Sequence, residues 1–218
     1  MPTATLTGSD REPRWPASLT LLATLILYIT LPDRLIPGPR WLVPALEAAL
    51  LVPLTLKAPH RYKEEPAAVR AASIILVAIV NVANVASLVL LVEFLVSGRS
   101  AAGRDLIIAA VQIWLTNVAI FALWYWELDR GGPGARRHPT ERHPDFLYPQ
   151  MANPKIAPTG WKPAFLDYFY VSLTNATAFS PTDTMPLTPA AKALMSVQSL
   201  ASLITVALVA ARAVNILA

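Results

Sequence analysis

Long blocks of apolar residues constrain the fold of this chain more than any other feature of its sequence. Hydrophobic residues make up 55% of the 218 positions and charged residues only 15%. Residues 106–126 contain no charged side chain, and residues 72–96 contain only Glu93. Since a helix of about 20 apolar residues crosses the hydrocarbon core of a bilayer, the pattern predicts an all-α integral membrane protein.

The apolar blocks predict five transmembrane helices and one shorter segment. The second block is short and contains Pro44 and Pro53. Residues 165–178 are apolar but too few to cross the bilayer, and irregular chain with Pro181 follows them. A short helix, irregular chain and then a full span predict a re-entrant helix and loop. The expected spans are residues 17–31, 42–56, 72–96, 106–126 and 190–216.

A proline-rich polar stretch, residues 127–163, lies between the fourth span and the short segment. Prolines are spaced along its whole length, and proline opposes regular helix and sheet. Its apolar residues, Phe146 and Tyr148 among them, indicate that it packs against the rest of the protein. We therefore expect an ordered loop or cap on the membrane face.

Residues 175–188, NATAFSPTDTMPLT, resemble the end of the pore helix and the selectivity filter of potassium channels, whose family pattern is TATTVGYGDxxPxT. The matching positions are Ala176, Thr177, Asp183, Pro186 and Thr188. The chain also resembles members of an uncharacterised group of bacterial membrane proteins with the same terminal module. The resemblance implies a pore-loop fold and a homotetramer, because one such loop cannot enclose a pore.

The same resemblance divides the chain into two regions. Residues 1–104 are expected to form an N-terminal three-span membrane region, and residues 105–218 a pore-like module. Within the module the resemblance implies an outer helix at 105–128, the proline-rich loop at 129–164, a pore helix and filter-like loop at 165–188, and an inner helix at 189–218.

The interior of the filter-like loop departs from the family pattern. Ser180 and Thr182 replace glycines, whose backbone angles a β-branched residue resists, and Pro181 replaces the tyrosine. A stack of carbonyl cages of potassium size is therefore not expected from this chain. The predicted filter and pore-lining residues are Thr177, Ala178, Phe179, Ser180, Pro181, Thr182 and Asp183.

Two functions are compatible with this loop. Four copies of its hydroxyl groups and of the Asp183 carboxylate would form rings that favour partly hydrated cations, which predicts a channel for monovalent cations with weak or unusual selectivity. In the alternative, the loop is a closed plug in a non-conducting scaffold or interaction protein. Asp183 would then cap the last helix or pair with Lys192.

Polar residues inside the expected spans also allow two roles. Gln198, Ser202 and Thr205 fall at i, i+4 and i+7, on one face of a helix. This inner-helix face either lines a pore cavity or hydrogen-bonds to its own backbone and to neighbouring helices. Two further patches are expected to face each other through inter-helix hydrogen bonds, and they comprise Asn81, Asn84, Gln112, Thr116 and Asn117.

Glu47, in the second expected span, is the strongest candidate for an intramembrane ionisable site. An ionised carboxylate at this depth must be protonated, paired or exposed to water. The sequence leaves open a proton or ion relay, as in a proton-coupled transporter, and a position near the membrane interface that the short, proline-containing span would allow.

The remaining motifs do not indicate an enzyme, a cofactor site or nucleic-acid binding. His60, His138 and His143 lie in polar loops. For His138 and His143, a weak metal site with Asp145 is the alternative to a solvated basic loop. Phosphate-binding glycine loops, nucleophile elbows and metalloprotease motifs are missing from the sequence. The net charge of +4 lies mainly in loops, where it favours contact with membrane lipids.

The expected location is a bacterial inner (plasma) membrane, crossed several times. The first apolar block has no cleavage pattern after it, so we expect it to be retained as a span. Two rules disagree on orientation. The positive-inside rule places the basic loops, including residues 57–70, in the cytoplasm, whereas the channel resemblance places the proline-rich loop outside, and we favour the second.

Overall fold

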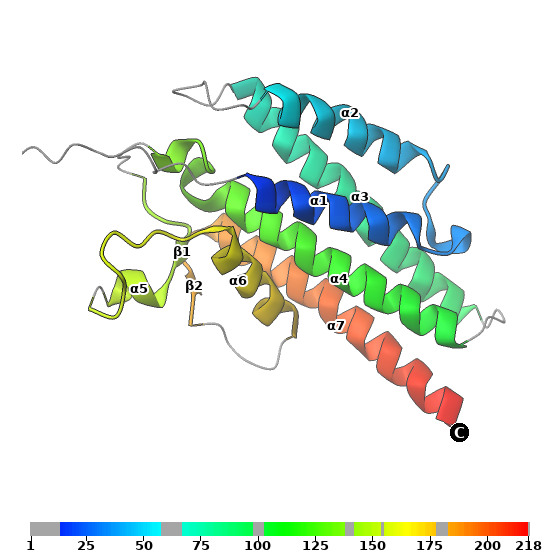
Figure 1. Cartoon of the computed structure of the whole chain (residues 1–218). Helices are drawn as coiled ribbons and strands as arrows, with labels where there is room; N and C mark the ends of the chain where they lie inside the picture. Colours follow the sequence, from blue (N-terminus) through cyan, green and yellow to red (C-terminus); the bar gives the residue numbers. More distant parts are fainter. Residues whose placement is uncertain are drawn as a thin grey trace, which may run out of the picture.

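The computed structural model describes residues 14–57, 67–97, 103–137, 142–153, 155–177 and 183–217. The protein is mostly helical (Figure 1). Three helices are long and apolar enough to cross a membrane: α3 (Ala67–Val96), α4 (Gly103–Leu128) and α7 (Pro189–Leu217). They coincide with the third, fourth and last expected spans, so the prediction of apolar membrane-length helices is confirmed there.

The first two expected spans are helical but shorter. Helix α1 (Trp15–Ile29) has 15 residues and α2 (Leu42–Lys57) has 16. At 1.5 Å per residue they reach about 22–24 Å, less than the ~30 Å of a bilayer core. They form a hairpin through the 3₁₀ turn η1 (Asp33–Leu35), which Arg40 closes by donating to the Leu31 carbonyl at 2.5 Å and pairing with Asp33 at 2.9 Å. Crossing by five helices stays a prediction.

Helix α4 is the centre of the bundle. It packs against α1, α3, α7 and the short helix α6 (Phe165–Thr177), whereas α2 packs mainly on α3. Apolar side chains form two clusters along the bundle. The first contains Leu21, Val80, Ile120 and Phe146, and the second contains Tyr28, Leu91 and Ile113 with their neighbours.

Helix α6 lies beside α4 and α7 at the end of the bundle that carries the first cluster (Figure 1). Its 13 residues reach about 20 Å, too short to cross a bilayer. Its bounds match the expected short helix within one residue.

The proline-rich stretch forms short ordered elements over the ends of α4 and α6. In chain order these are η2 (Asp129–Gly131), η3 (Ala135–Arg137), strand β1 (Phe146–Leu147) and the single-turn helix α5 (Pro149–Ala152). Strand β1 pairs antiparallel with β2 (Met185–Pro186), with Phe146 opposite Pro186. Phe146 and Tyr148 are buried in the first cluster, so packing of this stretch onto the helices is confirmed where the structure describes it.

Candidate functional site

The candidate site is the chain between α6 and α7. Residues Ala178, Phe179, Ser180, Pro181 and Thr182 lie outside the described residues, so the structure defines the site through its two flanks. On the first flank, the Thr177 hydroxyl donates to the Thr174 carbonyl of its own helix at 2.9 Å. On the second, the Asp183 side chain is exposed.

The start of α7 corrects one sequence-based alternative. Thr188, and not Asp183, caps the helix, because its Oγ1 accepts from the Ala191 backbone N–H at 3.3 Å. Within the part of the chain that the structure describes, no ion pair joins Asp183 to Lys192. Residues preceding a helix and rich in hydroxyls and carboxylates offer several capping candidates, which is why sequence alone did not select the threonine.

The first flank is fixed by a buried hydrogen-bond network centred on Gln198 of α7. Its Oε1 accepts from the Tyr125 hydroxyl at 2.5 Å and from Asn175 Nδ2 at 2.7 Å. Its Nε2 donates to the Ser172 Oγ at 2.6 Å and to the Ser172 carbonyl at 3.0 Å. An amide side chain has two donor and two acceptor positions, so Gln198 is fully satisfied and joins α4, α6 and α7.

A second level of the network lies one turn further along α7. Ser202 donates to the Ala176 carbonyl and accepts from Trp114 Nε1 at 2.7 Å. Asn175 donates to the Met195 carbonyl at 3.0 Å and accepts from Ser199 at 3.0 Å. The last turn of α6 is therefore bonded to α7 by both side chains and backbone.

These contacts define the inner-helix face that the sequence singled out. Gln198, Ser202 and Thr205 are buried on one face of α7. The first two bond to α4 and α6, and Thr205 donates to the Ala201 carbonyl at 2.8 Å. These side chains therefore form hydrogen bonds inside the chain, to neighbouring helices or to their own backbone. Lining of a pore cavity by this face stays a prediction.

The polar side chains of α4 form their hydrogen bonds with helices other than α3 among the described residues, and the expectation that the two patches face each other stays a prediction. Gln112 donates to Thr30 of α1 at 2.8 Å, and Asn117 reaches the Gln198 carbonyl of α7 at 3.4 Å. Thr116 bonds to its own helix, at the Gln112 carbonyl. Asn81 Oδ1 is buried without a donor among the described residues. Inter-helix bonding is thus present, but its partners are α1 and α7 because α4 is surrounded by four helices.

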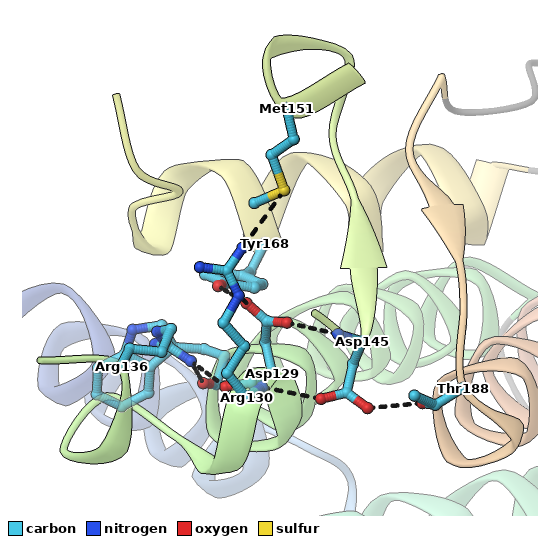
Figure 2. Close-up of polar contacts among 8 residues, drawn as sticks. Asp129, Arg130, Arg136, Asp145, Met151, Tyr168 and Thr188 are labelled. Atoms are coloured by element: carbon cyan, nitrogen blue, oxygen red, sulfur yellow. Dashed lines mark hydrogen bonds and ion pairs between the residues drawn. The ribbon is translucent and has the colours of Figure 1, made fainter. Parts of the chain in front are cut away.

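The second flank is fixed by two aspartates of the proline-rich stretch (Figure 2). Asp129 is fully buried, and its carboxylate accepts from the Tyr168 hydroxyl at 2.7 Å and from the Asp145 backbone N–H at 2.8 Å. The Asp145 carboxylate accepts from the Arg130 backbone N–H at 2.8 Å and from the Thr188 hydroxyl at 2.6 Å. The Asp145 carbonyl accepts from the Leu187 N–H at 2.8 Å.

This arrangement gives Asp145 a role that the sequence analysis missed. Both of its carboxylate oxygens accept hydrogen bonds within the protein. His138 lies outside the described residues, so a weak metal site with His138 and His143 stays a prediction. The chain described by the structure holds no group of three metal-binding side chains. In the sequence, this role of Asp145 was indicated only by an aspartate placed among prolines. Its hydrogen-bond partners are distant in the sequence, so they could not be recognised there.

Arg136 stabilises the same end of α4. Its guanidinium donates to the carbonyls of Trp126 and Asp129 at 2.6 and 2.8 Å, and it lies over the rings of Trp126 and Tyr168. A cation at a helix C-terminus satisfies carbonyls that have no helical partner. Burial raises the pKa of the Tyr168 hydroxyl well above its usual value, an effect that Arg136 opposes, so the hydroxyl stays protonated and donates to Asp129.

The second flank is connected by hydrogen bonds to the first turn of α6. Tyr168 of α6 bonds to Asp129, Asp129 bonds to Asp145, and Asp145 bonds to Thr188 at the start of α7 (Figure 2). We call these four residues the anchor chain. It joins the C-terminal end of α4, the first turn of α6 and the start of α7, and so sets where the chain enters α6 and where it enters α7.

Glu47 lies outside this site. It is 1% exposed on α2, and neither carboxylate oxygen has a hydrogen-bond partner among the described residues. The expectation of a buried side chain is confirmed, whereas a proton or ion relay and a position near the membrane interface both stay predictions.

No protein-family model, curated protein or solved structure matches this chain.

Proposed function

We propose that the chain forms a cation channel of weak or unusual selectivity, with residues 177–183 nearest the ion. The observation that supports it most is the anchoring of both flanks of this loop, by the Gln198 network on one side and the anchor chain on the other. A conducting loop must keep its geometry while ions exchange their hydration shells. The structure supplies the supports that such a loop requires.

Helix α6 adds a favourable electrostatic field. It ends at Thr177, directly before the loop, and the C-terminus of a helix carries a partial negative charge. Together with the Asp183 carboxylate, this end favours cations over anions. The hydroxyls of Thr177, Ser180 and Thr182 supply neutral oxygen ligands.

The proposal requires several copies around an axis, and we propose a homotetramer in the membrane. Helix α7 presents apolar residues to the outside, including Val197, Leu200 and Leu203. This face is available to a neighbouring copy and to lipid.

The test is ion flux through purified protein in liposomes. We expect flux of both potassium and sodium, reduced at least tenfold by Asp183→Asn, which removes the carboxylate and keeps the shape. The matched control is Asp105→Asn, an exposed aspartate at the opposite end of α4, which should leave flux unchanged. Flux equal in the wild type and the Asp183 variant would refute the proposal.

A non-conducting scaffold is the second candidate, and one observation favours it. Gln198 and Ser202 use their polar atoms inside the chain, so they present no free polar face to a cavity. A monomer or dimer in lipid, with no flux, would establish this alternative.

A further inference from the structure

A layer of polar residues crosses the bundle between its two apolar clusters. On α1, Thr24 lies between Leu21 of the first cluster and Tyr28 of the second. On α2, Glu47 lies in the same way between Leu50 and Val43. Asn84, Asn117 and Gln198 occupy the corresponding levels of α3, α4 and α7. We call Thr24, Glu47, Asn84, Asn117 and Gln198 the polar layer.

Glu47 is the member of this layer that has fully buried polar atoms without a hydrogen-bond partner among the described residues. Thr24 donates to the Leu21 carbonyl at 2.7 Å, Asn117 bonds to α7, and Gln198 is fully satisfied. Both Glu47 oxygens are buried without a donor among the described residues. A carboxylate would therefore lack the hydrogen bonds that make a buried charge tolerable.

A negative charge on Glu47 is also not neutralised by a neighbouring cation among the described residues. Helix α2 packs on α1 and α3. The titratable residue of α1 is Tyr28, and those of α3 are Arg70 and Glu93, close to its two ends. Arg70 is 14 positions from Asn84, about 21 Å along the helix. The described residues therefore place no cation at the level of the polar layer.

From this geometry we infer that Glu47 is a proton-binding site inside the bundle and holds its proton at neutral pH. A carboxyl group at membrane depth can be protonated, paired with a cation or hydrated. Glu47 is buried and has no partner or cation beside it among the described residues, so the protonated state remains. The bound species is a proton and not a metal ion, because a metal requires several oxygen ligands and Glu47 is the sole carboxylate of the layer. The site is independent of the loop at 177–183 and of whether that loop conducts.

The bound proton has a structural consequence. When the proton leaves, a charge remains among apolar residues, and the packing of α2 on α1 and α3 is weakened. The protein should therefore lose stability as the pH rises. Glu47→Gln imitates the protonated group, so it should abolish the loss of stability that deprotonation of Glu47 causes as the pH rises.

The first test reads the proton directly, by infrared spectroscopy of the protein in lipid nanodiscs at neutral pH. We expect a carbonyl band of a protonated carboxylic acid that is present in the wild type and absent in Glu47→Gln. The control Glu93→Gln changes an exposed glutamate of α3 and should keep the band. A wild type without the band, or a band that survives Glu47→Gln, would overturn the inference.

A second test needs no variant and so does not depend on how Glu47→Gln folds. Dicyclohexylcarbodiimide is an apolar reagent that modifies protonated carboxyl groups within membranes. Mass spectrometry of the treated wild type should find Glu47 modified at least tenfold more than Glu93. Equal modification of the two would contradict the inference, whereas failure of the channel proposal would leave this result unchanged.

Discussion

Single side chains determine how the end of α6 is held. Gln198 makes four hydrogen bonds to groups on two other helices. Because the Tyr125 and Ser172 partners are buried, removing the amide leaves several polar groups unpaired at once. An unpaired buried polar group costs about 1–3 kcal/mol, although hydrogen bonds between membrane helices are often worth less.

We therefore predict that Gln198→Leu lowers the free energy of unfolding by about 3 kcal/mol. The matched control is Gln112→Leu, which removes one side-chain bond, to Thr30, and should cost about 1 kcal/mol. Thermal unfolding in mild detergent measures both. Equal losses for the two glutamines would show that the Gln198 network does not stabilise the junction.

The bond between Tyr168 and Asp129 gives a second prediction at this scale. A hydrogen bond to a buried carboxylate contributes about 1.5–3 kcal/mol, so a double-mutant cycle of Tyr168→Phe and Asp129→Asn should show a coupling energy of about 1–2 kcal/mol. Tyr170, exposed on the same helix, is the control. A cycle of Tyr170→Phe with Asp129→Asn should give a coupling near zero, and a comparable value in both cycles would contradict the assignment.

The raised pKa of Tyr168 also sets a pH dependence. The phenol in the folded protein keeps its proton at a pH where the phenol of the unfolded chain, with a pKa of about 10, loses it. Its contribution to stability is therefore complete below pH ~10 and declines as the pH rises further. Tyr168→Phe should flatten the fall in unfolding temperature above that pH, and an unchanged slope would argue against the assignment.

At the scale of elements, the exit from α4 is the most constrained turn. Arg130 has a φ of +52°, and Gly131 and Gly132 follow with φ of +83° and +95°. This left-handed conformation ends the helix and turns the chain toward Asp145. It costs a residue with a side chain about 1–2 kcal/mol, whereas glycine adopts it freely.

Arg130→Gly should therefore leave stability unchanged or raise it by up to about 1 kcal/mol, since relief of strain offsets the lost contact with Met151 and the long, 4.0 Å ion pair with Asp129. The control Arg104→Gly lies in the first turn of α4, in ordinary helix, and should cost about 0.5–1 kcal/mol. The unfolding temperature should stay the same or rise in Arg130→Gly and fall in Arg104→Gly. A larger loss for Arg130→Gly would mean that its guanidinium contributes more than the turn costs.

The elements themselves were largely predictable, and their contacts were not. The expected spans 72–96, 106–126 and 190–216 differ from α3, α4 and α7 mainly at their ends, because long apolar runs leave little choice of structure. Helix α3 begins earlier, at Ala67, since hydropathy does not detect a helix that continues into polar sequence. The anchor chain joins residues up to 43 positions apart, and a local pattern contains no information on such pairs.

At the scale of the whole molecule, the two ends of the bundle differ. The proline-rich stretch covers one end, with the first apolar cluster beneath it, and the turn between α1 and α2 lies at the other, beside the second cluster (Figure 1). Which end faces the outside is the point on which the positive-inside rule and the channel resemblance disagree.

The chain contains no cysteine, so single cysteines can report the orientation without a background. We expect Lys155→Cys, exposed in the proline-rich stretch, to react with a membrane-impermeant maleimide on intact cells. Arg34→Cys, exposed in the turn between α1 and α2, should react only after the membrane is opened. The reverse result would show that the basic loops determine the orientation and that the proline-rich stretch faces the cytoplasm.

The anchor chain also bears on how such a protein can change over evolutionary time. The four residues of the anchor chain are separate in sequence from the five positions 178–182 that link α6 to α7. The hydrogen bonds of the anchor chain involve none of those five positions, so we expect substitutions there to leave the anchor chain in place at little cost in folding. The same separation makes these positions a natural place for grafting: the sequence TVGYG can be exchanged into them while the supports on both sides are kept.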